Sequence, residues 1–595
     1  MFFFFAVLLA ISLYYASFFC KTYRSSFAQR LIYSQGKECL MVYSRRDFIK
    51  TGLLTGCSLC GRFESNPQVL ADSSPQHKRP LFATGEYKRI DAKERAYHIS
   101  CSPDMFDQYE DLAEIWRAAG VTDAWLCTWF YGYFPYTWEK LDHCLDLIQR
   151  AGLRPHLISV PFCHGGGALD PRSEGFPNLP PEHWKRVQRW DGTEQWGFSW
   201  HQPADSEGAQ AIKTLYERYG VFDYFLDDDF RFAASPGVIG GCVCDQCRSD
   251  FLTKFGYRHD RWNDVIDDVR NSSETEYLHA WVDFFCDRMT QCFRTYQSAV
   301  PEIDLGIMVM YMGCERAGIR LEDYKDVLFR VGEGCFNDGW YGATKNKTIE
   351  LYSSLFHRRF CQPGRSFSET TVFPERSLSA VNMASKLSIS TICDVRNTCF
   401  MSGLVPIDPG HWSTLGVRMK REREMHARLV GARLAGPFKH YYGVSSRYCS
   451  GENPYSLFLA LGTPFEVCDE LPKDGWIFLS DADARASERG ALDLTNAKFF
   501  ARFESGAGRF QKLSEDFDSL FQFRRSILVD LQKGKIPYVE EEIPIVLAWY
   551  PDVNAVYIWN PEEKEVKFHV RRGDKLLSMC LAALDSTYVD LGALE

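Results

Sequence analysis

The 595-residue sequence predicts an α/β protein whose main part is a (β/α)8 TIM barrel. From about residue 95, short apolar runs alternate with amphipathic helical segments, which is typical of parallel β/α units. Eight such runs precede residue 402, the number that a closed barrel needs. The predicted strands are 96–101, 123–130, 154–161, 222–226, 304–310, 327–335, 365–368 and 391–401.

Beyond the barrel, the sequence predicts a closing helix and two smaller domains. The helix, 415–434, is rich in Arg and Lys. A small α/β layer then begins near Phe438, and a tail of strands separated by turn residues indicates antiparallel β structure. The strands predicted for these domains are 456–461, 476–479 and 498–502, followed by 543–549, 555–559 and 566–571. The predicted domains are therefore 85–435, 436–530 and 531–595.

Composition excludes one class of function and favours another. The chain is too long for a single core, which agrees with several domains. Its net charge of -10 provides no basic surface for nucleic acid. The 15% aromatic content favours an aromatic-lined cleft. The 21 cysteines are scattered along the chain, so most are expected to be buried thiols rather than a disulfide framework.

The amino-terminal region carries an export signature. Residues 44–50, Ser-Arg-Arg-Asp-Phe-Ile-Lys, match a twin-arginine signal and precede a short apolar run. Residues 54–57 resemble a lipobox, whose Cys57 would be acylated and attach the protein to a membrane; the alternative is cleavage near residues 69–71. We therefore expect a bacterial protein exported by the twin-arginine route, either periplasmic or a membrane-anchored lipoprotein.

The segment ahead of this signature does not fit an export signal. Residues 1–20 are nearly all apolar and would by themselves suggest a transmembrane helix. A signal seldom begins forty residues into a chain, so we expect Met41 to be the true start and 1–40 to be a misassigned extension. Residues 41–84 would then be the signal and a linker.

Three carboxylates follow the fourth predicted strand. Residues 222–226 have the apolar pattern of a buried strand, and Asp227, Asp228 and Asp229 come next. Three adjacent charges repel, which raises one pKa until that group can hold a proton near neutrality. A proton donor beside a carboxylate can cleave a glycosidic bond. The alternative is an acidic turn that caps the next helix, with Arg231 as its ion-pair partner.

Other polar and aromatic residues are expected at the same end of the barrel, where the chemistry of this fold takes place. Together they predict a sugar site, in which aromatic rings stack on the apolar faces of sugars and polar groups bind hydroxyls. Any single ring could instead belong to the core. The predicted sugar-binding residues are Trp129, Tyr131, His164, Trp200, Asp227, Arg231, Tyr311, Asp338 and Trp340, and Glu369 is a candidate catalytic carboxylate.

A cysteine cluster follows the acidic segment. Cys242, Cys244 and Cys247 have Cys-x-Cys-x2-Cys spacing, so one loop can bring all three to one tetrahedral ion. Thiolates suit zinc. The alternative is a loop with three free thiols.

The order of these parts resembles the glycoside hydrolase family 42 β-galactosidases, as a distant relative. The resemblance implies a barrel of the clan A type, a flavodoxin-like trimerisation domain, a small C-terminal β domain and a homotrimer. It aligns Asp228 with the family's Asn and Asp229 with its acid/base Glu, a departure from the family pattern, and Glu369 with its nucleophile at the end of strand seven.

The same resemblance implies a structural zinc site completed by a fourth ligand upstream. His201 lies 242 − 201 = 41 positions before Cys242 and is the candidate, with Cys163 as the alternative; the other interpretation of His201 is a sugar ligand. A closed four-ligand site would be structural rather than catalytic.

These observations give a leading hypothesis and two others. The first is an exported, zinc-stabilised glycoside hydrolase that retains anomeric configuration if its carboxyl groups lie about 5 to 5.5 Å apart, and inverts it at wider spacing. Asp338 is the reserve candidate for the second carboxylate. The second hypothesis is a catalytically inactive lipoprotein that binds glycans. The third is a zinc metallohydrolase using His156, His164 and the Asp triplet.

Overall fold

The structure is a computed structural model of the chain. It describes residues 78–81, 94–162, 181–199, 201, 204–226, 230–231, 239–309, 312, 314–331, 334–403, 405–449, 454–494 and 498–594. Every described residue lies in one compact unit, residues 63–595. The predicted extension, the twin-arginine signal and Cys57 lie outside the described residues. None of the described helices has both the length and the apolar character needed to cross a membrane.

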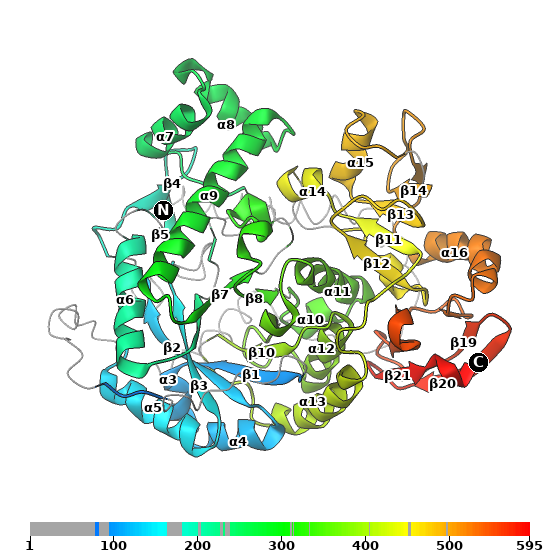
Figure 1. Ribbon diagram of the computed structural model, residues 1–595, viewed down its shortest axis with the longest axis horizontal. Helices are drawn as coiled ribbons and strands as arrows, with labels where there is room; N and C mark the ends of the chain where they lie inside the picture. The colour runs from blue at the N-terminus through cyan, green and yellow to red at the C-terminus, as the bar shows by residue number, and fades with distance from the viewer. Residues whose placement is uncertain are drawn as a thin grey trace, which may run out of the picture. The chain divides into compact units, whose positions relative to one another are not determined.

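Eight parallel strands close into a barrel, which confirms the TIM-barrel prediction (Figure 1). The first and last strands pair in parallel with each other, so the sheet has no free edge. The strands are buried on both faces, which explains why they appear in the sequence as nearly continuous apolar runs. In barrel order they are β1 (Ala96–Cys101), β2 (Asp123–Phe130), β3 (Arg154–Val160), β6 (Asp223–Leu226), β7 (Asp304–Val309), β8 (Leu328–Val331), β9 (Ser366–Thr371) and β10 (Asn397–Met401).

Two strand predictions are too long by several residues, and the predicted strand 365–368 is too short, because β9 continues to Thr371. The run 391–401 begins inside a helix, because Thr391 and Ile392 end α12 (Ala380–Ile392) and β10 starts only at Asn397. Thr391 Oγ1 donates to the Leu387 carbonyl oxygen at 3.1 Å, a bond from a helical side chain to the preceding turn. The prediction 327–335 overshoots as well, since β8 ends at Val331.

Helices and one hairpin connect the barrel strands. Threonine and serine side chains cap several helices; for example, Thr137 Oγ1 accepts from the Lys140 amide and Thr275 Oγ1 from the Leu278 amide, both at 3.3 Å. The helix predicted at 415–434 is α13, which starts and ends earlier than expected. The helices are α3 (Pro103–Gln108), α4 (Leu112–Ala119), α5 (Trp138–Arg150), α6 (Ala204–Tyr219), α7 (Asp245–Phe255), α8 (Trp262–Asn271), α9 (Glu276–Ala299), α10 (Asp338–Tyr341), α11 (Thr344–Arg358), α12 and α13 (His411–Ala427), and the hairpin is β4 (Arg186–Gln188) and β5 (Glu194–Ser199).

The next part of the chain forms a five-stranded sheet in which every neighbouring pair is parallel. Its order is β12 (Phe465–Cys468), β11 (Phe438–Tyr441), β13 (Trp476–Leu479), β14 (Lys498–Ala501) and β15 (Gln511–Lys512). Its helices are α14 (Val444–Cys449), α15 (Asp481–Glu488) and α16 (Phe517–Lys533). The strand predicted at 456–461 is wrong, because Leu457–Ala460 is a 3-10 helix. Its side chains are all buried, so apolar character alone could not distinguish it from a strand.

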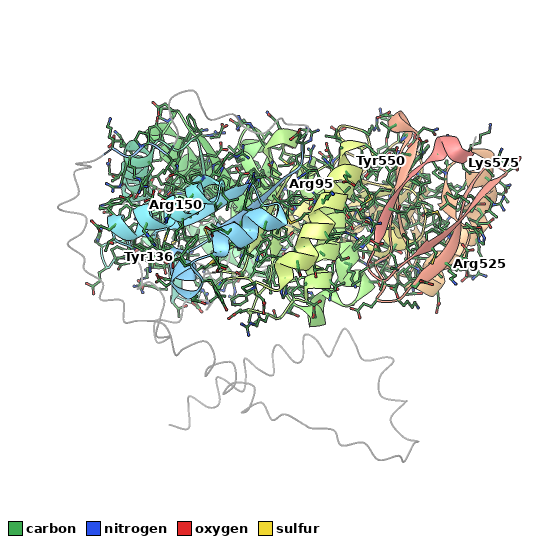
Figure 2. The ribbon with its side chains drawn as sticks, turned by 90° about the horizontal axis from the view of Figure 1, so that it is seen from below. Arg95, Tyr136, Arg150, Arg525, Tyr550 and Lys575 are labelled. Atoms are coloured by element: carbon green, nitrogen blue, oxygen red, sulfur yellow. The ribbon has the colours of Figure 1, made fainter. Side chains whose placement is uncertain are left out.

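The chain ends in two antiparallel three-stranded sheets (Figure 2, where Tyr550 and Lys575 mark one strand of each). One contains β16 (Tyr538–Val539), β19 (Val566–Arg572) and β20 (Lys575–Leu581), and the other β17 (Val546–Tyr550), β18 (Ala555–Trp559) and β21 (Ser586–Asp590). The predicted strand 555–559 coincides with β18, and 566–571 ends one residue before β19 does.

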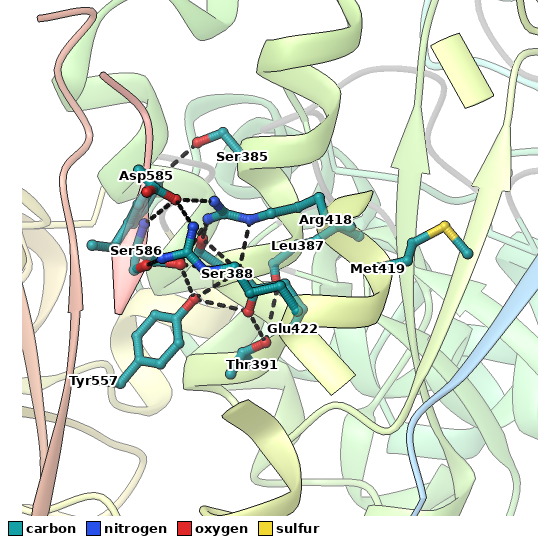
Figure 3. Close-up of polar contacts among 12 residues, drawn as sticks. Ser385, Leu387, Ser388, Thr391, Arg418, Met419, Glu422, Tyr557, Asp585 and Ser586 are labelled. Carbon is teal, nitrogen blue, oxygen red and sulfur yellow. Dashed lines mark hydrogen bonds and ion pairs between the residues drawn. The ribbon is translucent and has the colours of Figure 1, made fainter. Parts of the chain in front are cut away.

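A buried polar network joins the last of these sheets to α13 (Figure 3). Glu422 forms an ion pair with Arg418 one turn earlier, 2.8 Å between Nε and Oε1. The Tyr557 hydroxyl donates to both Glu422 oxygens at 3.0 and 2.9 Å, and Ser586 Oγ donates at 3.0 Å. The network satisfies a carboxylate that is fully buried, and it fixes β18 and β21 against the barrel.

Candidate active site and metal centre

Glu369 lies inside the barrel on β9, the seventh strand in barrel order. It shares its face of the strand with Phe367, two residues earlier, whose ring packs against Phe225 and Trp125 in the barrel interior. Glu369 is 2% exposed. Its carboxylate is therefore a buried acid that requires polar partners.

Two side chains supply these partners. Arg330 on β8 donates from Nε and Nη2 to Oε2 of Glu369 at 3.3 and 3.0 Å. Thr371 Oγ1, two residues along the same strand, donates to Oε1 at 2.5 Å. Arg330 is itself fully buried, with its guanidinium 5.8 Å from the centre of the Phe225 ring. Glu369 therefore has a fixed orientation and a counter-charge in contact with it.

A separate cluster of polar side chains lies inside the barrel, on strands β1 to β3. Asp123 Oδ1 lies 2.8 Å from His156 Nε2, and Oδ2 accepts from Arg154 Nη2 at 2.6 Å. Burial raises the pKa of the Asp123 carboxyl, but His98, His156 and Arg154 outweigh this effect and hold that pKa well below its usual range. His156 is thus engaged near the start of β3 and its ring stacks on Trp125, which counts against the hypothesis that it ligates a catalytic zinc.

The acidic segment follows β6, the fourth strand in barrel order, which ends at Leu226. Asp227, Asp228 and Asp229 lie outside the described residues. Arg231, shortly after them, is buried. The carboxyl ends of strands four and seven are at the same end of a parallel barrel, so Leu226, the last residue of β6, lies at the end toward which β9 also runs.

The loops after β8 and β9 are linked to each other. Asp338 Oδ1 accepts from the Ser379 amide and from Asn382 Nδ2, both at 2.8 Å. The Phe373 amide donates to the Phe336 carbonyl oxygen at 2.9 Å. Asp338 therefore holds the two loops together, a role that the sequence did not indicate.

These linked loops carry two exposed aromatic rings. Trp340 is 43% exposed and Phe373 is 57% exposed, and the Phe336 ring lies edge-on to Trp340 at 6.2 Å. Exposed aromatic rings can stack on a ligand, although singly exposed apolar side chains are common on protein surfaces. Sequence reasoning missed Phe373, although an aromatic residue two positions beyond the end of strand seven was a usable signal.

The other predicted sugar-binding residues have different surroundings. Trp129 and Tyr131 are each 1% exposed, and Trp129 packs against Trp184 with ring centres 6.3 Å apart. Both therefore belong to the core in this structure. His164, Trp200 and Tyr311 lie outside the described residues.

The four predicted metal ligands converge. His201 Nε2 lies 3.3, 3.7 and 3.6 Å from the sulfur atoms of Cys242, Cys244 and Cys247. Zinc bonds of 2.0–2.1 Å to nitrogen and 2.3 Å to sulfur at a tetrahedral angle require a separation of about 3.5 Å. The donor set and its spacing therefore fit one tetrahedral ion. Cys163, the alternative ligand, lies outside the described residues.

Known structures share this architecture. A β-galactosidase from the psychrophilic Marinomonas ef1 matches with 10% identity over 83% of this chain and 99% of its own, at a TM-score of 0.55. The fold is similar to that of this β-galactosidase. Gan42B, a family 42 β-galactosidase from G. stearothermophilus, matches with 11% identity over 86% of this chain and 99% of its own, at a TM-score of 0.54.

A third β-galactosidase, from Bacillus circulans sp. alkalophilus, gives the same result, with 10% identity, coverage of 83% and 98%, and a TM-score of 0.54. No protein-family model and no curated protein sequence matches the chain. The glycoside hydrolase likeness is thus one of fold.

Proposed function

We propose that the protein is an exported glycoside hydrolase that cleaves an O-glycosidic bond, with Glu369 as nucleophile and Asp229 or Asp228 as acid/base. The buried, oriented Glu369 carboxylate on strand seven is the observation that carries the proposal. Three aspartates after strand four and the β-galactosidase fold support it.

In this mechanism the acid donates its proton to the glycosidic oxygen while Glu369 attacks the anomeric carbon. The leaving group departs with that proton, and a covalent glycosyl-enzyme forms. The same aspartate then removes a proton from water, which attacks the anomeric carbon and releases Glu369. Arg330 places a positive charge beside the carboxylate and holds it in a fixed orientation for attack. The outcome is retention of anomeric configuration.

An aspartate as acid/base has a consequence for substrate position. Asp is one carbon shorter than Glu, so the glycosidic oxygen must come closer to strand four than it would with a glutamate. Either Asp229 or Asp228 could meet this requirement, and only substitution of each separates them.

The substrate is proposed to be a glycan that stacks on exposed aromatic rings. Trp340 and Phe373 suit this role because each presents a large ring to solvent at the end of the barrel where strand seven finishes. Arg231, Asp227, His164, Trp200 and Tyr311 complete the proposed sugar site. Trp129 and Tyr131 would support it from the core rather than by direct stacking.

The remaining proposals concern stability, assembly and location. We propose that His201 and the three cysteines hold a structural zinc ion, because the set is closed and its spacing suits that ion.

The strand order β12-β11-β13-β14-β15 is 2-1-3-4-5 in chain order, which is the flavodoxin-like order. This order supports a trimerisation-type domain at 436–530. The barrel domain would then be 85–435 and the β domain 531–595. Twin-arginine export, with an acylated Cys57 as membrane anchor, completes the proposal.

The second candidate function is glycan binding without catalysis. The observation that favours it is the replacement of an Asn-Glu pair by Asp228 and Asp229. The exposed rings would serve a binding protein equally well.

The first experiment measures release of nitrophenol from a panel of aryl glycosides by the wild type and by Asp228→Asn, Asp229→Asn and Glu369→Gln. Hydrolysis that collapses in Glu369→Gln and in one aspartate variant establishes the glycosidase and identifies its acid. For Glu369→Ala, azide should restore turnover and give a glycosyl azide of inverted configuration, because the small anion replaces the missing nucleophile. A folded, metal-loaded protein that is inactive on every substrate but retained on a glycan column would support the binding function.

A further inference from the structure

We propose that Glu274, His279 and Cys449 bind a second transition-metal ion of the zinc class, which joins the barrel helix α9 to α14 of the following domain. One ligand atom from each residue lies within 4.8 Å of the other two. This site is separate from the four-ligand cluster and does not depend on the proposed hydrolase activity.

The three donors come from two helix ends that pack together. Glu274 directly precedes Thr275, which caps α9, and His279 lies in the first turns of that helix. Cys449 is the last residue of α14. The helices are in contact beside the cluster, since Tyr448 places its ring 4.9 Å from that of His279 and donates its hydroxyl to Asp283 Oδ1 at 2.5 Å.

The imidazole of His279 provides an independent sign of a ligand. Its Nε2 atom is buried and has no hydrogen-bond partner among the residues that the structure describes. A buried ring nitrogen without a partner destabilises the folded protein. A metal ion bound through Nε2 would satisfy it.

The carboxylate already has the outer contacts that metal ligands usually have. Glu274 Oε1 accepts from Ser445 Oγ, and Oε2 accepts from Arg489 Nη2. Each oxygen retains a second lone pair, so these bonds orient the carboxylate without blocking it.

Cys449 is anchored through its backbone. Arg316 Nη1 donates to the Cys449 carbonyl oxygen at 2.6 Å, and Arg316 Nη2 donates to Ser272 Oγ at 3.2 Å. The arginine thus connects the end of α14 to the segment just before Glu274. This contact holds the backbone at Cys449 beside that segment.

The types of ligand atom indicate which metal ions would bind at this site. One sulfur, one imidazole nitrogen and one carboxylate oxygen suit Zn²⁺ or Co²⁺ rather than Mg²⁺ or Ca²⁺, which prefer oxygen ligands. A thiolate and a carboxylate together neutralise a divalent ion. Ligand atoms at most 4.8 Å apart need about 1 Å of closure to reach tetrahedral spacing, which rotation of the Cys449 or His279 side chain can provide.

Metal stoichiometry tests the proposal. The full chain is stripped of metal, titrated with Co²⁺ and followed by the thiolate-to-cobalt charge-transfer absorption, with bound metal counted by mass spectrometry. We expect two ions per chain in the wild type and one in Cys449→Ser and in His279→Gln. Cys247→Ser should lose the other ion and keep this one. Cys468→Ser, a buried cysteine on β12, is the matched control and should keep both.

The outcomes separate cleanly. A wild type that binds one ion or none, with no loss in Cys449→Ser and His279→Gln, overturns the proposal. Retention of both ions in these two variants overturns it as well. If the four-ligand cluster binds nothing, the wild type still shows one ion that Cys449→Ser and His279→Gln remove, and the proposal stands.

Discussion

Arg330 on β8 donates to Glu369 on β9 through two nitrogen atoms at 3.3 and 3.0 Å, and both side chains are buried inside the barrel. The pair combines a proposed catalytic carboxylate with the charge that makes its burial tolerable. Activity and stability should therefore respond to different substitutions at these two positions.

For activity, Glu369→Gln should lower kcat/KM by about 10³-fold or more, because an amide cannot form the glycosyl-enzyme. Turnover of aryl glycosides is the measurement. Ser368→Ala, on the opposite face of the same strand, is the matched control and should retain activity, since Ser368 Oγ contacts Thr398 and Ser390 rather than the carboxylate. Equal activity in wild type and Glu369→Gln would refute the assignment.

For stability, Arg330→Met should lower the free energy of unfolding by about 3–5 kcal/mol, since it leaves a buried carboxylate without its counter-charge. Adding Glu369→Gln should recover part of this loss, because the amide carries no charge. Denaturant unfolding of both single variants and the double variant gives the coupling energy. Additive effects would mean that the ion pair is not coupled.

Substitution of the exposed aromatic rings should affect long substrates and spare the fold. Phe373→Ala and Trp340→Ala should each raise KM for oligosaccharides about 2- to 10-fold, the loss of a stacking contact worth about 0.5–1.5 kcal/mol. Val417→Ala, exposed on α13, serves as control. If neither ring variant differs from this control, the rings do not bind substrate.

The buried histidine His98 in the barrel interior should make the folded protein less stable at acidic pH. Burial lowers the pKa of His98 from 6.5 to about 4, although Asp123 opposes this effect. Between pH 6.5 and about 4, the His98 side chain is protonated in the unfolded chain but neutral in the folded protein. The free energy of unfolding is therefore highest above pH 6.5 and falls as the pH decreases toward about 4. A pKa difference of this size is worth about 3 kcal/mol.

Replacement of His98 tests this linkage. In His98→Gln the free energy of unfolding should vary less between pH 6.5 and 4 than in the wild type, because the glutamine cannot titrate. Denaturant melts across this range give the slope. Identical slopes in the two proteins would assign the acid sensitivity between pH 6.5 and 4 to other groups.

Removal of the metal should lower the thermal stability of the protein without directly abolishing its catalytic activity. The four-ligand cluster has no open position, so we expect a chelator to lower Tm while any protein that stays folded retains its rate. Tm and initial rates measured on the same samples provide the test. A rate that disappears while Tm and the folded fraction are unchanged would favour a metallohydrolase instead.

The sequence predicted more of the fold than of the site. Two of the eight barrel strands were predicted with both ends correct, at 96–101 and 123–130, because strands buried on both faces form apolar runs with distinct ends. The same rule failed at 456–461, where a buried 3-10 helix is equally apolar, and at 391–396, where a helix end and its turn look like a strand.

At the metal cluster, sequence spacing was informative because three ligands come from one short loop. His201 was selected by resemblance, and the structure places its Nε2 within 3.3–3.7 Å of all three sulfurs. The cluster of Glu274, His279 and Cys449 had no such pattern, since its third ligand is 170 positions beyond the second (449 − 279). Only the packing of α14 on α9 brings it together.

The sequence by itself determined that this chain forms a barrel and that Glu369 belongs to the region of its seventh strand, because hydrophobic periodicity is a local property; the predicted strand stopped at 368, whereas β9 continues to Thr371. Tertiary structure alone decided which cation faces Glu369, which loops Asp338 joins, and whether Trp129 or Phe373 is open to solvent. Those relationships depend on strands and loops that closure of the sheet brings together from distant parts of the chain. No local pattern encodes them.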